Sequence, residues 1–151
     1  MRFLSLTLLA PALLLIMPLS ASAETCELSI SSNDQMQYNK SEMVVGSNCD
    51  EVTVELEHTG ELSAQQMGHN WVLVESGDYQ AVSQEGMNAG MANDYVPQDD
   101  DRVIANTEVI GGGESTSVTF DVSQLESGGD YTFFCSFPGH SSVMQGELVV
   151  E

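Results

Sequence analysis

The sequence predicts an all-β protein, a two-sheet β-sandwich of Greek-key type with one short helical excursion. Three observations predict this fold. Short runs of residues alternate between apolar and polar side chains, which is the period of a half-buried strand. Clusters of glycine and serine separate these runs, as turns would. One segment, Ser76–Tyr95, lacks the alternation and is compatible with a helix.

The N-terminus has the features of a secretory signal peptide. Arg2 provides a positive charge, a mostly apolar run follows, and residues 21–23 (Ala-Ser-Ala) match a signal peptidase site. We therefore expect a signal peptide over residues 1–23, cleavage after Ala23 and export to the periplasm. Residues 24–151 are expected to form one domain. The apolar run is too short to indicate a membrane span, so no membrane insertion is expected.

The sequence contains three cysteines. In an oxidising compartment two of them should pair, and three different pairs are possible. Cys26 and Cys49 have no histidine beside them, which favours a Cys26–Cys49 disulfide. Cys135 is then left free, in the segment that is richest in other metal-binding side chains.

The chain is strongly acidic, with 23 acidic residues against 3 basic ones and a net charge of −20. One basic residue belongs to the predicted leader, so the mature chain has 2 against 23, a net charge of −21. This charge excludes a nucleic-acid or anionic-membrane binder, whose surface must be basic. It indicates a solvated, self-repelling surface. Adaptation to high salt, which screens the repulsion, is a second interpretation.

The strands follow from the alternation. In one run Val52, Val54 and Leu56 fall on one face, with acidic residues and a threonine on the other. The glycine-rich clusters Gly111–Gly113 and Ser127–Gly129 mark turns. The expected strands are Glu27–Ser31, Met43–Val45, Glu51–His58, Trp71–Val74, Val103–Ile110, Ser115–Val122, Asp130–Phe134 and Glu147–Val150.

Between these strands, Asp78–Met87 is expected to form a short helix outside the sandwich, ending near Gly86 or Gly90. The acidic run Asp99–Asp101 lacks the alternation and the turn glycine of a calcium loop. We therefore interpret it as a solvated loop.

One stretch near the C-terminus, Cys135 to Met144, carries the spacing C-x4-H-x3-M. It supplies a thiol, the imidazole of His140 and a thioether. These ligands suit copper when a second histidine completes the trigonal plane, and His69 is the candidate. The turn at Pro138–Gly139 can bring His140 back towards Cys135. The pattern predicts a mononuclear electron-transfer copper site.

Two segments, Met67–Trp71 and Phe133–His140, closely resemble the azurins, the bacterial blue copper proteins. The resemblance covers essentially the whole mature chain, including the 23-residue separation between Cys26 and Cys49, and implies a cupredoxin-like fold. Further similar segments are Asn33–Gln37, Asp101–Ala105 and Ser117–Val122.

The resemblance implies a role for each ligand. His69, Cys135 and His140 would form the trigonal plane, with Met144 as the long axial ligand. The backbone carbonyl of Gly68 would make a weak contact on the opposite side. The cofactor would be one copper ion that cycles between Cu(II) and Cu(I) in a one-electron carrier without enzymatic turnover.

The resemblance also implies supporting roles. Asn70 would tie the two ligand loops together, and the backbone N–H of Phe137 would point at the Cys135 sulfur. His58, at a strand end, is expected to be a packed or capping histidine. An apolar rim around His140 would form a docking patch for weak redox encounters. Its expected members are Met36, Leu62, Met67, Met87, Phe137, Pro138, Gly139 and Val143.

By resemblance alone, the partners would be c-type cytochromes, copper nitrite reductase or amine dehydrogenases. This protein is expected to be a monomer that forms transient complexes with them. The sequence departs from the azurin pattern in its near-absence of lysine and in Asn106, which replaces a common surface histidine. Both changes alter the electrostatics towards partners.

The alternatives to an electron carrier are a copper enzyme, a hydrolase and a metal-binding module of another sort. A copper enzyme needs a further centre built from several histidines, and only His58 remains unassigned. A Cys135–His140 hydrolase is disfavoured because the two residues point at a shared ion rather than at a substrate. Copper storage, copper delivery or a zinc site would use the same ligands.

Overall fold

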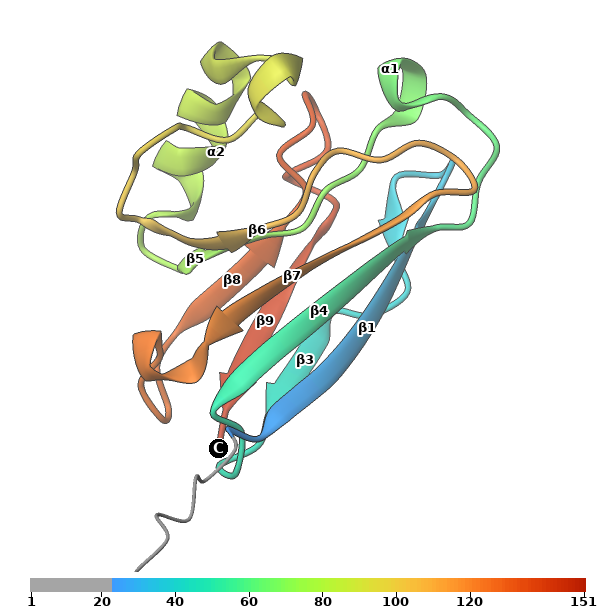
Figure 1. The fold of residues 1–151 in the computed structure, drawn as a ribbon. Coiled ribbons are helices and arrows are strands. Elements are labelled where there is room, and N and C mark those ends of the chain that lie inside the picture. Colours follow the sequence, from blue (N-terminus) through green and yellow to red (C-terminus); the bar gives the residue numbers. More distant parts are fainter. Residues whose placement is uncertain (1–22) are drawn as a thin grey trace, which may run out of the picture.

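A computed structural model describes residues 23–151; the predicted signal peptide, apart from Ala23, lies outside the described residues. Two mixed β-sheets pack face to face (Figure 1), which confirms the predicted β-sandwich. One sheet has the strand order β2-β1-β4-β7 and the other β3-β9-β8-β5-β6. The strands are β1 (Thr25–Asn33), β2 (Gln37–Tyr38), β3 (Glu42–Val45), β4 (Glu51–His58), β5 (Val72–Glu75), β6 (Val103–Asn106), β7 (Ser115–Asp121), β8 (Tyr131–Phe134) and β9 (Gln145–Val150).

The alternation in β4 explains how its sheet faces the core. Val52, Val54 and Leu56 are fully buried, whereas Glu55 and Glu57 on the other face are exposed. β4 pairs with β1 in parallel and with β7 in antiparallel orientation, so it is an inner strand. In an inner strand that buries one face, apolar and polar side chains alternate with a period of two. The prediction of this strand rested on that alternation.

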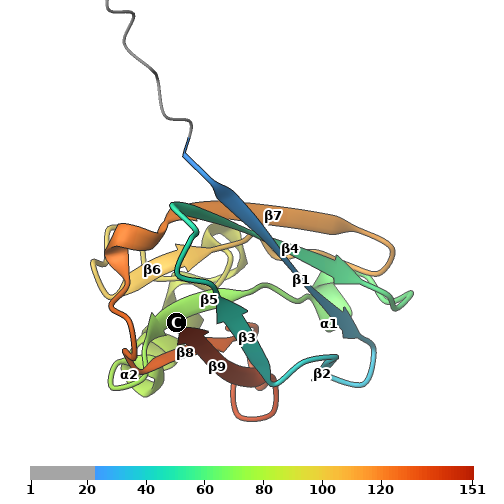
Figure 2. The same ribbon diagram turned by 90° about the horizontal axis from the view of Figure 1, so that it is seen from below.

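The main core lies between the two sheets. Trp71 and Phe133 are completely buried, and their rings stack with centroids 6.1 Å apart. Leu56 from one sheet, and Leu73 and Leu148 from the other, belong to the same cluster. Seen from below, the two sheets form separate layers (Figure 2), and the cluster draws its residues from both. A packed core of this kind gives the loops at its ends a rigid base.

The predicted helical excursion is confirmed as α2 (Tyr79–Ala89), which lies outside the sandwich beside β5 and β8 (Figure 1). Val82 on α2 packs against Val72, Val74 and Phe134 in a second, smaller apolar cluster. The helix ends at Gly90, whose φ of 74° suits glycine.

Some elements differ from the predictions. The strand expected over Val103–Ile110 ends at Asn106, because Ile110 instead forms an isolated bridge with His69. The short helix α1 (Ala64–Met67) was not predicted, since four residues are too few to show a helical period. β2 and the 3-10 turns η1 (Met91–Asn93) and η2 (Val122–Gln124) were also not predicted, because they are equally too short to show a period.

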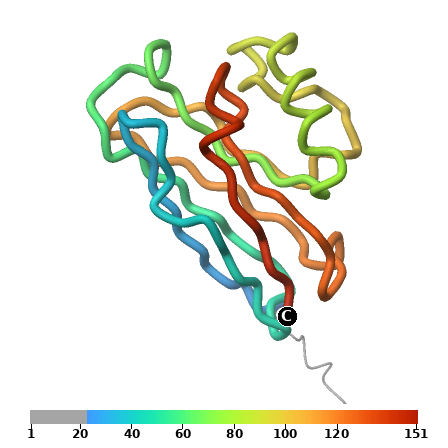
Figure 3. The backbone as a smooth tube through the Cα atoms, turned by 180° about the vertical axis from the view of Figure 1, so that it is seen from behind, coloured from blue at the N-terminus to red at the C-terminus, as the bar shows by residue number. Residues whose placement is uncertain are grey.

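The predicted disulfide is confirmed: Cys26 and Cys49 are bonded, with their Cα atoms 5.6 Å apart. It ties the start of β1 to the segment before β4. The C-terminus lies at the same end of the sandwich, whereas α1, α2 and the loop between β8 and β9 lie at the opposite end (Figures 1 and 3). Among the described residues, no helix has the length and apolar character needed to cross a membrane.

Candidate metal centre

Two loops at one end of the sandwich carry the four predicted metal-binding side chains. His69 follows α1 and precedes β5, while Cys135, His140 and Met144 lie between β8 and β9. These loops are side by side at the end away from the C-terminus (Figures 1 and 3). His69, Cys135 and Met144 are fully buried, and His140 keeps 4% of its surface exposed.

The donor atoms are arranged for a single ion. The Cys135 Sγ lies 3.8 Å from His69 Nδ1 and 3.7 Å from His140 Nδ1, and all three atoms are within 4.8 Å of one another. Metal bonds of about 2.3 Å to sulfur and about 2.0 Å to nitrogen, spread by about 120°, separate the two donors by roughly 3.7 Å. The side chains therefore fit a trigonal N₂S site, the donor set that suits copper.

His69 is held in the tautomer that a metal ligand requires. Its Nε2 lies 2.8 Å from the backbone carbonyl of Asn33, to which it donates a proton, so Nδ1 keeps its lone pair facing Cys135. Its backbone is fixed by two hydrogen bonds with Ile110, of 3.0 and 2.9 Å. Burial lowers the pKa of His69 to about 4, so the ring is neutral at neutral pH.

Cys135 is a thiol whose ionisation needs a cation. Burial raises its pKa to about 12, although the backbone N–H groups of Asn70 and Phe137 hydrogen-bond the sulfur and act in the opposite direction. The predicted contact from Phe137 is thus present, and Asn70 supplies a second one. These two donors stabilise a thiolate once a metal offsets the cost of burial.

The turn that returns His140 towards Cys135 depends on Gly139. This residue has a φ of 83°, which a side chain would strain. The N–H of His140 donates to the Phe137 carbonyl (3.0 Å), and the N–H of Met144 donates to the His140 carbonyl (2.8 Å). Cys135 then donates its own N–H to the Met144 carbonyl (2.9 Å), which closes the loop.

Gly68 lies where the chain passes very close to its neighbours. A Cβ atom there would come within 2.4 Å of the Ala64 carbonyl oxygen and 2.6 Å of a Val109 methyl group. Glycine is therefore required between α1 and His69 for packing reasons alone.

The chain matches known copper proteins over its length. The sequence profile of the family described as copper binding proteins, plastocyanin/azurin family, matches residues 24–151. The chain belongs to this family. It is 55% identical to the azurin of Achromobacter denitrificans over 145 residues, covering 93% of this chain and 97% of that one.

Two further relatives agree. The azurin of Pseudomonas aeruginosa is 47% identical over 144 residues, covering 95% of this chain and 97% of that one. Among solved structures, the azurin Az-iso2 of Methylomonas sp. strain J superposes with a TM-score of 0.81 at 48% identity, covering 83% and 98% of the two chains. The protein is an azurin-type cupredoxin, a one-electron carrier whose cofactor is one copper ion.

In this cupredoxin Asn70 joins three segments. Its Oδ1 accepts the Ser136 N–H (2.9 Å), and its Nδ2 donates to the Ser136 hydroxyl (2.8 Å). The same Nδ2 also donates to the backbone carbonyl of Asp94 (2.8 Å). Asp94 has a φ of 53°, and its carboxylate accepts the Val109 N–H (2.8 Å). Ser136 and Asp94 were not predicted, because the only sequence signal for either is the tolerance of aspartate for positive φ.

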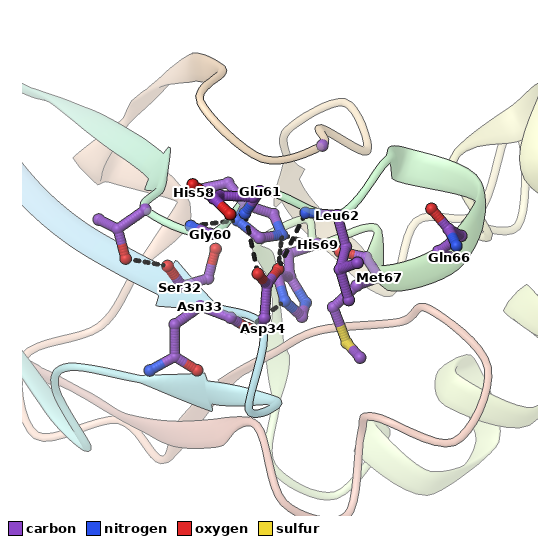
Figure 4. Close-up of polar contacts among 12 residues, drawn as sticks. Ser32, Asn33, Asp34, His58, Gly60, Glu61, Leu62, Gln66, Met67 and His69 are labelled. Atoms are coloured by element: carbon purple, nitrogen blue, oxygen red, sulfur yellow. Dashed lines mark hydrogen bonds and ion pairs between the residues drawn. The ribbon is translucent and has the colours of Figure 1, made fainter.

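His58 packs directly behind His69 (Figure 4), with ring centroids 4.6 Å apart. Its Nδ1 accepts the Gly60 N–H (3.0 Å) and its Nε2 lies 2.8 Å from the Met67 carbonyl. The Asp34 carboxylate is 3.9 Å from the same Nε2. Both nitrogens of this fully buried ring are therefore engaged, so His58 is a packed histidine that supports the backbone before His69.

The predicted apolar rim is partly exposed. The segments that carry it are the β1–β2 turn, the loop leading into α1, α1 itself, α2 and the β8–β9 loop, all at the metal end (Figure 1). Phe137 and Met67 are half-buried, and the ring centroids of Phe137 and His140 are 4.7 Å apart. The exposed members are Met36, Leu62, Met87, Pro138, Gly139 and Val143.

Proposed function

We propose that His69, Cys135 and His140 hold the copper in a trigonal plane, with the Met144 thioether and the Gly68 carbonyl on its two sides. Copper held in this way supplies a Cu(II)/Cu(I) couple. The observation that carries the proposal is the separation of 3.7 and 3.8 Å between one buried thiol and two buried imidazole nitrogens. The chain transfers single electrons between partners and has no substrate of its own.

The scaffold favours electron transfer over catalysis. The ligand residues are buried and their loops are joined by Asn70, so the side chains move little between oxidation states. Both nitrogens of His58 are already engaged, so it offers no ligand for a second copper. An enzyme of the multicopper type would need such a ligand.

Visible absorption tests the ligand set. Adding Cu(II) to the metal-free protein should give an intense blue colour and a reversible voltammetric wave, and Cys135→Ser should abolish both. A colourless product, or one that releases copper on reduction, would instead indicate zinc binding or copper delivery. Met144→Leu should shift the reduction potential, because it removes the axial thioether. Met87→Leu, a change at an exposed methionine, is the matched control.

We propose that the apolar rim is the docking surface and that the protein meets its partners as a monomer in transient complexes. The mature chain has a net charge of −21, from 23 acidic and 2 basic residues. A partner with a basic face around an apolar centre suits this surface, because opposite charges steer the encounter. Among the expected partners, c-type cytochromes, copper nitrite reductase and amine dehydrogenases, those with such a face should react fastest.

Two matched substitutions test the docking surface. Val143→Asp places a charge in the rim, whereas Val44→Asp adds the same charge at an exposed valine on β3. Electron transfer to a basic cytochrome should slow in Val143→Asp alone. The rate for the unmodified protein should fall as salt is added, and a rise would contradict the proposed basic partner.

We propose export to the periplasm with cleavage after Ala23, leaving residues 24–151 as the mature domain. The Glu24 nitrogen lies 2.8 Å from an Asp50 carboxylate oxygen. Cleavage would convert this nitrogen into an ammonium group, which the carboxylate would pair. N-terminal sequencing of protein from the periplasmic fraction tests the site, and a start other than Glu24 would contradict it.

A further inference from the structure

Two tyrosine hydroxyls bind the backbone next to the two imidazoles of the site. Tyr38, on β2, donates its hydroxyl proton to the backbone carbonyl of Asn70. Tyr79, at the start of α2, donates to the backbone carbonyl of Ser141 at 2.7 Å. Asn70 directly follows His69 in the chain, and Ser141 directly follows His140.

The rings of the same tyrosines pack on the strand that leads to Cys135. Tyr38 lies against Phe133, with ring centroids 5.8 Å apart. Tyr79 meets Phe134 edge-on, at 5.0 Å and an interplanar angle of 79°. Because successive residues of a strand point to opposite faces, the two tyrosines approach β8 from opposite sides.

These contacts act on the backbone of the residues that directly follow the two histidines. The plane of the peptide that follows a residue depends on that residue's ψ, since the peptide unit is rigid. The peptide after His69 carries the Asn70 N–H, which hydrogen-bonds the Cys135 sulfur. A hydroxyl fixed to the Asn70 carbonyl restrains the residue that makes this contact, and the hydroxyl on Ser141 restrains the residue that follows His140.

We infer that Tyr38 and Tyr79 are positioning residues that hold the His69 and His140 loops in their metal-binding arrangement before the ion arrives. The inference rests on the proposed ligand set. Neither tyrosine touches the ion. Each hydroxyl restrains its loop in the metal-free protein, so the loop loses less conformational freedom when the ion binds. This raises the affinity for copper.

Phenylalanine substitutions test the inference, because they keep the rings and remove only the donors. The variants are Tyr38→Phe, Tyr79→Phe and the double variant. Tyr131→Phe is the matched control: its hydroxyl accepts the Glu126 N–H at 2.8 Å, in the turn before β8. Three quantities are measured for each protein: the Cu(II) dissociation constant by chelator competition, the EPR spectrum of the Cu(II) form, and the unfolding free energy of the metal-free form.

Each single substitution should weaken copper binding roughly fivefold, the equivalent of one net hydrogen bond, and the double variant should bind more weakly still. The EPR lines should shift or broaden as the ligand loops loosen. Tyr131→Phe should lower stability and leave both copper readouts unchanged.

Two results would overturn the inference: a double variant with the affinity and EPR spectrum of the parent, or an equal change in Tyr131→Phe. A parent protein that turns no blue colour with Cu(II) would instead overturn the proposed ligand set. The two failures are therefore distinguishable.

Discussion

Copper binding should release one proton per ion, and that proton should come from Cys135. Burial raises the pKa of this thiol to about 12, so almost no molecule carries a thiolate at pH 7. Burial lowers the pKa of His69 to about 4 and lowers that of His140 as well, so both rings are already neutral. The apparent affinity should therefore rise about tenfold per pH unit, equal to about 1.4 kcal/mol.

The assay is a competition titration of the metal-free protein with a chelator of known protonation, between pH 7 and pH 9.5. The slope should stay at one over this range, whereas a thiol with the ordinary pKa of about 8.5 would flatten the curve above that pH. Calorimetry in buffers of different ionisation enthalpy gives the proton count independently. Release of no proton at pH 7 would show that the thiol is already ionised. Release of two would show that an imidazole was charged.

Three other predictions concern stability. The metal-free protein should lose stability as pH falls from about 6.5 towards about 4, because the unfolded state takes up protons that the buried His69 and His140 do not bind in the folded state; urea unfolding at pH 7.5 and pH 5 checks this, and His69→Asn should reduce the dependence. Replacing Cys26 and Cys49 by serine should cost roughly 2–4 kcal/mol of unfolding free energy, with an unchanged blue spectrum, because the disulfide lies at the far end of the sandwich. Transfer from molar salt to dilute buffer should lower the unfolding midpoint, because the net charge of −21 is then unscreened; an unchanged midpoint would argue against high-salt adaptation.

The fold was predictable where local patterns decide it. β4 buries Val52, Val54 and Leu56 on one face of an inner strand, and its sequence shows that alternation directly. The end of β6 was not predictable, because Ile110 leaves the strand to pair with His69, a partner 41 positions away in the chain. Long-range pairing of this kind leaves no local signal.

At the metal centre, too, local patterns were predictable and long-range contacts were not. Cys135, His140 and Met144 lie in one loop, so their spacing alone indicated a metal. The tyrosines left no such trace, because Tyr38 and Tyr79 reach partners 32 and 62 positions away. A tyrosine in a strand or helix indicates that its ring is buried. The sequence does not show which group accepts the proton of its hydroxyl.

The placement of the C-terminus opposite the copper end has a practical consequence. β9 runs from the ligand loop to Val150, one residue before the end of the chain (Figure 1). A linker joined to Glu151 could anchor the molecule to an electrode or fuse it to another protein while the rim faces outward. Such an attachment would set the orientation of the molecule without altering any residue that shapes its redox chemistry.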